Sequence, residues 1–246
     1  MKIKKLLDKI LSVLFVKDIK CLYCDKELNK PNKFCLCDDC LSKLEYNNKN
    51  TCKKCGVPIG EYTSLCPRCF VSKFSFTNAY SVFVYNGVIK DLIKKFKFAG
   101  GKYIGEYLSK FLYEKYVEAK INCDIVIPVP IHKTTLNKRG YNQAEVLCIA
   151  FEDILPIRTD ILIKQKLTKE QAKLNLSERK KNLQDAFTVN NNEEIKDKSI
   201  LLIDDVFTTG NTVNECSKTL KKFGAKKVYV LTICSTNYFI IEKINY

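Results

Sequence analysis

Apolar residues recur with two different periods along the chain, and from about residue 76 onwards the two periods alternate in blocks. Apolar runs bounded by turn residues are typical of strands and occupy residues 76–87, 123–130, 159–164, 198–205 and 226–235. Apolar residues spaced three and four apart predict helices over residues 88–101, 102–119, 140–155 and 211–225. Because strands and helices alternate, we predict an α/β fold with a mostly parallel sheet and helices on both faces.

The first 20 residues carry a pattern of their own. Their apolar positions follow the spacing of one helical face: Ile3, Leu6, Leu7, Ile10 and Leu14. We expect an amphipathic helix over residues 1–20 that docks on the protein. A helix lying on a membrane surface is the alternative, and it would place the protein at the inner face of the membrane.

A signal peptide is not expected, because Asp8 and Lys9 interrupt the apolar stretch and no small-residue cleavage site follows. No apolar run approaches the roughly 20 residues that a transmembrane helix needs. We therefore expect a cytoplasmic protein without an integral membrane segment.

The thirteen cysteines are distributed unevenly, with nine of them between Cys21 and Cys69. Eight form four Cys-x2-Cys pairs separated by gaps of 12, 11 and 10 residues: Cys21/Cys24, Cys37/Cys40, Cys52/Cys55 and Cys66/Cys69. Two thiolates at this spacing hold one metal ion, and two such pairs complete a tetrahedral site. We predict two structural four-cysteine Zn²⁺ sites; a disulfide framework is the alternative, and a reducing cytoplasm argues against it.

The spacing does not decide how the pairs combine. Sequential pairing makes two small ribbons, whereas interleaved pairing makes one cross-braced module. Cys35 is a spare or substitute ligand, and the later Cys123, Cys148, Cys216 and Cys234 are predicted to be small core residues. We expect a zinc module over residues 21–72 and an α/β domain over residues 76–246.

The net charge of +15, from 42 Lys and Arg against 27 Asp and Glu, favours anionic partners such as nucleic acid, phosphate ligands or an acidic membrane surface. A lysine-rich composition with no such partner is the alternative, because Lys greatly outnumbers Arg.

The stretch ILLIDDVFTTGNTV, residues 200–213, carries the most specific chemistry. A buried strand runs into Asp204 and Asp205, and a Thr/Gly loop then leads directly into a helix. Backbone N–H groups of such a loop hold a phosphate monoester, and carboxylates one step upstream suit ribose hydroxyls or a Mg²⁺ bound to them. The pattern predicts a site for a ribose 5-phosphate.

This stretch resembles the phosphoribosyl pyrophosphate (PRPP) motif of type I phosphoribosyltransferases along its full length. The resemblance implies that Asp204 and Asp205 are the catalytic pair that contacts the ribose hydroxyls. It further implies PRPP-binding residues on the rest of the motif: Val206, Phe207, Thr208, Thr209, Gly210, Asn211 and Thr212.

A second resemblance covers nearly the whole chain. The tandem cysteine pairs, then YNGVIKDLIKKFKFAG, PVPIHKTTLNKRGYNQAEVL and LTKEQAKLNLSERKKNLQDAF, and finally the PRPP motif, follow the order of the ComF (competence protein F) family. It implies a type I phosphoribosyltransferase-like fold, and a partnership with single-stranded DNA and a helicase-like translocase during DNA uptake. Arg179 and Asn182 match the family pattern of a loop that closes over PRPP, whereas Lys166 stands where relatives usually have Arg.

A basic segment follows the predicted strand at 123–130. In type I phosphoribosyltransferases the loop at this place grips pyrophosphate, and the resemblance assigns Lys138, Arg139 and Gly140 to it. A basic loop facing an acidic pair suits Mg²⁺–pyrophosphate. His132, the single histidine of the sequence, is expected to be structural.

In KKFKF, residues 94–98, Lys94, Lys95 and Lys97 alternate with aromatic rings, a pattern that suits single-stranded DNA. The alternative is that Phe96 and Phe98 belong to the core. Two functions therefore remain open: a PRPP-binding phosphoribosyltransferase-like protein that acts with single-stranded DNA, or an inactive nucleic-acid-binding or translocase-docking module that keeps the fold as a scaffold. The short C-terminal segment offers no evident pocket for an acceptor base, so enzymatic turnover is left open.

Overall fold

A computed structural model describes residues 19–30, 32–61, 63–98, 100–166 and 185–237. The predicted N-terminal amphipathic helix and the predicted closing loop, with Arg179 and Asn182, lie outside these ranges. No helix among the described residues is long and apolar enough to cross a membrane.

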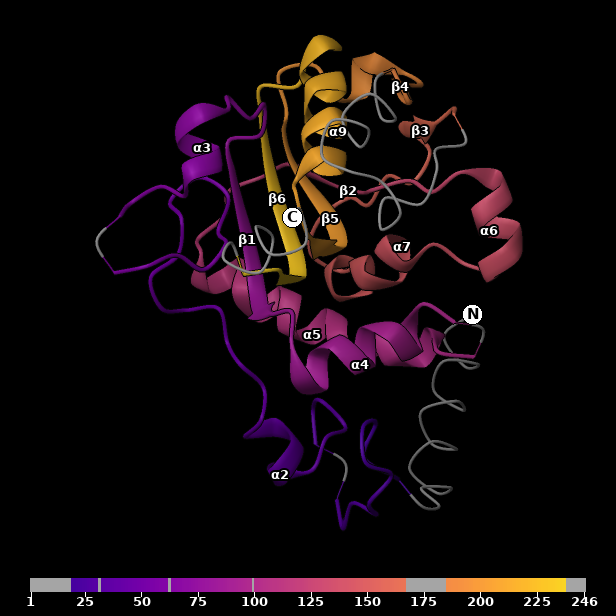
Figure 1. Ribbon diagram of the computed structural model, residues 1–246. Helices are drawn as coiled ribbons and strands as arrows, with labels where there is room; N and C mark the ends of the chain where they lie inside the picture. The colour runs from indigo at the N-terminus through magenta and orange to yellow at the C-terminus, as the bar shows by residue number, and fades with distance from the viewer. Residues whose placement is uncertain (1–18, 31, 62, 99, 167–184, 238–246) are drawn as a thin grey trace.

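Four parallel strands form the central sheet (Figure 1). They are β1 (Asn78–Val84), β2 (Ile125–Pro128), β5 (Ser199–Phe207) and β6 (Lys227–Ser235), in the order β1-β6-β5-β2. The register pairs Ile203 with Leu231 across β5 and β6, and Pro128 with Ile203 across β2 and β5. The carboxyl ends of β2 and β5 therefore meet at one edge, where ligands bind in sheets of this kind.

Helices cover both faces of the sheet, as predicted. Leu201 and Ile203 join the core formed with α4 (Gly87–Phe96), α5 (Lys102–Glu118) and α7 (Gln143–Leu147). Ile200 and Leu202 join the core formed with α9 (Asn211–Lys222). Successive strand residues point to opposite faces, and β5 is apolar throughout its first half because both faces are buried.

Two stretches differ from the sequence prediction. The basic segment after β2 forms a helix, α6 (Lys133–Arg139), and the predicted helix over 140–155 begins only at Gln143 and continues as a 3-10 helix, η1 (Cys148–Phe151). Gly140 ends α6 in the left-handed region, at φ 83°, and the side chain of Asn142 accepts a hydrogen bond from the backbone of Ala144 to start α7. The prediction missed these two caps, which divide the segment.

The predicted strand at 159–164 lies outside the main sheet. It forms β3 (Leu162–Lys164), which pairs antiparallel with β4 (Phe187–Val189), a strand that the sequence did not predict. A short 3-10 helix, η3 (Asn192–Glu194), then leads to β5. The motif strand is also longer than predicted, because β5 continues through Phe207.

The cysteine pairs combine sequentially into two ribbons, which contain the short helices α2 (Asp38–Leu41) and α3 (Pro67–Val71). The first ribbon packs beside α4 and α5, where the rings of Phe34 and Phe111 stack with centroids 3.7 Å apart. The second ribbon packs on the core of the other face, and the backbone N–H of Ala79 in β1 donates to Lys54 O at 2.9 Å. Figure 1 shows α2 below α4 and α5, and α3 beside the upper end of β1.

Candidate functional site

The eight paired cysteines lie in two groups whose sulfur atoms are all within 4.8 Å of one another: Cys21, Cys24, Cys37 and Cys40, and Cys52, Cys55, Cys66 and Cys69. Cys24 and Cys37 Sγ are 3.7 Å apart, and so are Cys55 and Cys66 Sγ. Four sulfurs around a tetrahedral zinc, at about 2.3 Å each, stand about 3.8 Å from one another. The two sets therefore fit one Zn²⁺ each, with no position left for a substrate.

The remaining cysteines have other places. Cys35 is buried outside the first zinc set, with its Sγ 3.4 Å from Lys20 O, so it is spare rather than a ligand. The four later cysteines are buried core residues, as predicted: Cys123, Cys148, Cys216 and Cys234.

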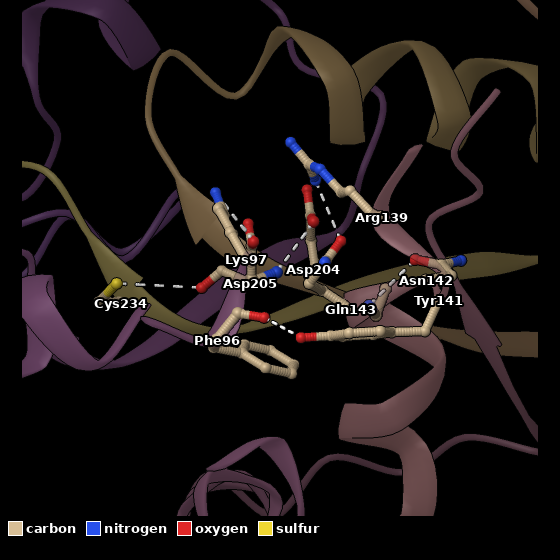
Figure 2. Close-up of polar contacts among 10 residues, drawn as sticks. Phe96, Lys97, Arg139, Tyr141, Asn142, Gln143, Asp204, Asp205 and Cys234 are labelled. Atoms are coloured by element: carbon tan, nitrogen blue, oxygen red, sulfur yellow. Dashed lines mark hydrogen bonds and ion pairs between the residues drawn. The ribbon is translucent and has the colours of Figure 1, made fainter. Parts of the chain in front are cut away.

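The acidic pair of the motif lies near the carboxyl end of β5. Asp205 is almost fully buried, and its Oδ2 receives an ion pair from Lys97 Nζ at 2.9 Å. The backbone N–H of Asp205 donates to Asp204 Oδ1 at 2.9 Å, and this hydrogen bond fixes the Asp204 carboxylate (Figure 2). Lys97 follows α4 in the chain, which brings a cation from one face of the sheet to this carboxylate.

Burial raises the pKa of the Asp204 carboxyl to about 7, and the neighbouring charge of Asp205 adds to the rise. The hydrogen bond from the Asp205 backbone, together with the cations of Lys97 and of Lys164 on β3, acts in the opposite direction. Burial alone would lower the pKa of Lys97, but Asp205 and Asp204 raise it above its ordinary value, so Lys97 stays charged. Asp204 is therefore a proton-sensitive group whose negative charge is partly balanced by two lysines.

The loop after the acidic pair has the form of an anion cradle. Gly210 adopts φ 74° and is the N-cap of α9, and a Cβ placed there would meet the ring of Phe207 at 2.5 Å. Thr209 is buried, whereas Thr208 is half-buried. The side chain of Phe207 packs against Phe76 in the core, so it anchors the loop to the core beneath Gly210. A loop that enters a 12-residue helix in this way presents N–H groups to an anion.

The rest of the motif occupies less central positions. Val206 is half-buried against the core on the α4 and α5 face, and Asn211 and Thr212 are half-buried in the first turn of α9. Asn211 and Thr212 therefore stand at the positions where a helix N-terminus meets an anion.

The segment after β2 places a second cation, Arg139, near the acidic pair. Arg139 ends α6 half-buried, and its Nη1 donates to Gln143 Oε1 at 3.0 Å, while Lys138 and Gly140 are exposed. Figure 2 shows Arg139, Gln143 and Asp204 gathered in one place. Gln143 is 3% exposed, and its Nε2 has no hydrogen-bond partner among the described residues. A buried amide donor without a partner is costly, which makes it a candidate contact for a bound ligand.

The lysines of KKFKF are used in different ways. Lys94 pairs with Asp91, and Lys95 Nζ donates to Tyr23 O of the first ribbon at 3.2 Å. The alternative to DNA binding placed both Phe96 and Phe98 in the core. Phe96 is fully buried, which confirms it for that residue, but Phe98 is 71% exposed, so the alternative is wrong for Phe98.

His132 has the structural place that was expected. Its Nδ1 accepts a hydrogen bond from the backbone of Thr134 at 3.2 Å, which caps α6.

Sequence reasoning did not assign Gln143, Lys164 or the pairing of Lys97 with Asp205. Gln143 lies inside the RGYNQAE stretch, so the motif itself could have drawn attention to it. The contacts of Lys97 and Lys164 depend on how separate elements pack, and no local pattern predicts them.

Comparison with known proteins agrees with this architecture. A model of the phosphoribosyl transferase domain matches residues 134–241, and a model of the double zinc ribbon domain matches residues 10–70. Competence protein F of Haemophilus influenzae is 30% identical over 221 residues, which are 87% of this chain and 95% of that protein.

Two further relatives have similar coverage. Competence protein ComFC of Streptococcus pneumoniae is 30% identical over 87% of this chain and 99% of its own length. DNA utilization protein YhgH of Escherichia coli O6:H1 is 29% identical over 82% of this chain and 90% of its own length. With this identity over nearly the full length of its relatives, the chain belongs to the competence protein F (ComF) family.

Proposed function

We propose that this protein binds PRPP, or another ligand with a 5-phosphoribosyl group, and works with single-stranded DNA in natural competence. The observation that carries the proposal is the convergence of three features at one edge of the sheet. An acidic pair, two cations and a loop that opens a helix come from separate parts of the chain and meet there.

Each feature matches one part of the ligand. The Thr208–Gly210 loop and the start of α9 receive the 5-phosphate, and Asp204 and Asp205 receive the ribose hydroxyls. Arg139 and the exposed Lys138 would hold the pyrophosphate, and the unpartnered Gln143 Nε2 supplies a neutral donor beside Arg139.

Magnesium fits the same donors, because Asp204 and Asp205 offer the carboxylate oxygens that this ion prefers. When bound, Mg²⁺ would neutralise charge on the pyrophosphate. Catalysis in such a site consists mainly of positioning and charge neutralisation, so no dedicated nucleophile is needed.

A scaffold without turnover is the second candidate, and the Lys97–Asp205 ion pair favours it. Lys97 occupies one carboxylate oxygen of the acidic pair at 2.9 Å, so a ligand or a metal ion has to displace it or share it. In that reading the protein docks nucleic acid or a translocase and keeps the ribose site for regulation.

The relatives' names concern competence and DNA utilization, which supports a role in handling incoming DNA. We propose that the protein has this role in the cytoplasm. There it would meet incoming single-stranded DNA and a helicase-like translocase.

Calorimetric titration of Mg²⁺–PRPP into the zinc-loaded protein tests the proposal. We expect binding to the wild type and at least a tenfold loss in Asp204→Asn/Asp205→Asn, because the carboxylates lose their charge while keeping their shape. The exposed pair Asp38 and Asp39, also adjacent aspartates, provides the matched control Asp38→Asn/Asp39→Asn, which should bind as the wild type does. No binding to the wild type would leave the scaffold candidate.

A further inference from the structure

The second zinc ribbon touches the phosphate loop directly. Arg68 lies between the ligands Cys66 and Cys69, and its Nη1 donates to Thr209 O at 2.6 Å. Thr209 belongs to the loop that opens α9, 141 residues further along the chain. One end of the zinc site is therefore joined to the candidate site for the 5-phosphate.

The other half of the same zinc site is fixed to the sheet. Lys54, between Cys52 and Cys55, accepts a hydrogen bond from the backbone of Ala79, and its Nζ donates to Thr77 O at 3.0 Å. A Zn²⁺ bound by the four cysteines would join the two halves, and so connect β1 to the phosphate loop through Arg68.

We propose that Arg68 is a positioning residue for the phosphate site, and that the second zinc ribbon thereby sets the affinity for a phosphate monoester. This inference rests on the proposed ribose-phosphate function and adds a zinc ribbon residue to that site.

The geometry of one peptide unit explains the effect. The carbonyl of Thr209 and the N–H of Gly210 belong to the same planar trans peptide, so they point in opposite directions. Arg68 holds the carbonyl, and the N–H therefore points away from the ribbon. Among the described residues, no hydrogen bond is donated by the Gly210 N–H. A cation on the carbonyl polarises the peptide and makes this N–H a stronger donor to an anion.

A second contact holds the other side of the loop. The backbone N–H of Ser75, just after the ribbon, donates to Asn214 Oδ1 in the first turn of α9 at 2.7 Å. The loop is thus braced at Thr209 and at Asn214 by the same segment of the chain. A loop whose N–H donors are already fixed binds an anion more tightly than a loop that must become ordered on binding, because it loses less conformational entropy.

The first ribbon has no such role. Asp39 takes the place of Arg68 there, between Cys37 and Cys40. Its side chain is 74% exposed and makes a surface ion pair with Lys26 at 3.7 Å. The two ribbons share a metal geometry, but only the second carries a cation to the loop. Asp39 therefore gives a matched control position.

The test measures two ligands on the full-length, zinc-loaded protein by calorimetry. Ribose 5-phosphate reports on the phosphate loop, and Mg²⁺–pyrophosphate reports on the neighbouring side at Arg139. We expect Arg68→Met to weaken ribose 5-phosphate binding about tenfold or more and to leave Mg²⁺–pyrophosphate binding unchanged. Arg68→Lys, which keeps the charge, should recover part of the loss, and Asp39→Asn should match the wild type.

Two controls keep the result interpretable. Metal analysis should find two zinc ions in Arg68→Met as in the wild type, and amide hydrogen exchange at residues 208–211 should be faster in Arg68→Met than in Asp39→Asn. Equal affinities of the wild type and Arg68→Met for ribose 5-phosphate would overturn the inference and leave the proposed function standing. Absence of ribose 5-phosphate binding in the wild type would overturn both.

Discussion

At the scale of single residues, the carboxyl of Asp204 is sensitive to pH near neutrality. Burial raises its pKa from 3.8 to about 7, so the folded protein binds more protons than the unfolded chain between these two values. The stability of the wild type should therefore fall as the pH rises through this window, whereas Asp204→Asn, which mimics the protonated form, should not follow it. We expect the variant to gain about 2 kcal/mol relative to the wild type between pH 5.5 and 8. Urea unfolding at both pH values measures this, and a constant difference between the two proteins would contradict it.

The charges around Asp204 are those of Asp205, Lys97 and Lys164, with Arg139 nearby in Figure 2. The sequence predicted the acidic pair and the Thr/Gly loop because their order along the chain is local. It did not predict that Lys97 would pair with Asp205 or that Gln143 would keep a free buried donor, since both depend on the packing of separate elements.

At the scale of elements, the two periods of the apolar pattern located all four strands of the main sheet and the helices α4, α5 and α9. The pattern did not predict helix boundaries that are set by local caps, such as Gly140 and Asn142, which separate α6 from α7. It also failed for β4, because three residues are too few to show a period.

The docking of the first ribbon on α5 can be tested at this scale. Phe111 is 1% exposed and its ring stacks on Phe34 of the ribbon and meets Phe83 of β1 edge-on, with centroids 5.0 Å apart. Phe111→Ala should lower the free energy of unfolding by about 3–5 kcal/mol, because it leaves a cavity between three elements. Phe98→Ala removes the same ring from an exposed position and should change it by less than about 0.5 kcal/mol. Denaturation of both variants at saturating zinc makes the comparison, and similar losses would contradict the packing.

At the scale of the whole molecule, the ribbons lie on opposite faces of the α/β sheet and extend its two cores. The segment between them pairs with the edge of β1, where the backbone of Asn47 donates to Val82 O at 2.8 Å and that of Val84 donates to Glu45 O at 2.9 Å. The number and spacing of the cysteines predicted two metal sites. The sequence could not show that the two ribbons pack against the cores on opposite faces of the sheet. The first ribbon meets α4 and α5, and the second braces the phosphate loop.

The net charge of +15 is a property of the whole chain, and its contribution to DNA binding is testable through salt. Each phosphate contact to single-stranded DNA contributes a slope of about 0.7 in log affinity against log salt, so about five contacts would weaken binding roughly 100-fold between about 50 and about 200 mM. Fluorescence anisotropy with a labelled oligonucleotide measures the slope. An affinity that does not change over this range would refute the electrostatic part of the proposal.

The same measurement locates the DNA. Lys138 beside Arg139 and Lys26 on the first ribbon are both exposed lysines, so Lys138→Gln and Lys26→Gln remove equal charge from two distant parts of the fold. If DNA lies across the ribose-phosphate site, Lys138→Gln should reduce the slope by about 0.7 and Lys26→Gln should not. The reverse result would place the DNA on the first ribbon, and it would separate the ribose-phosphate site from the nucleic acid that the positive charge attracts.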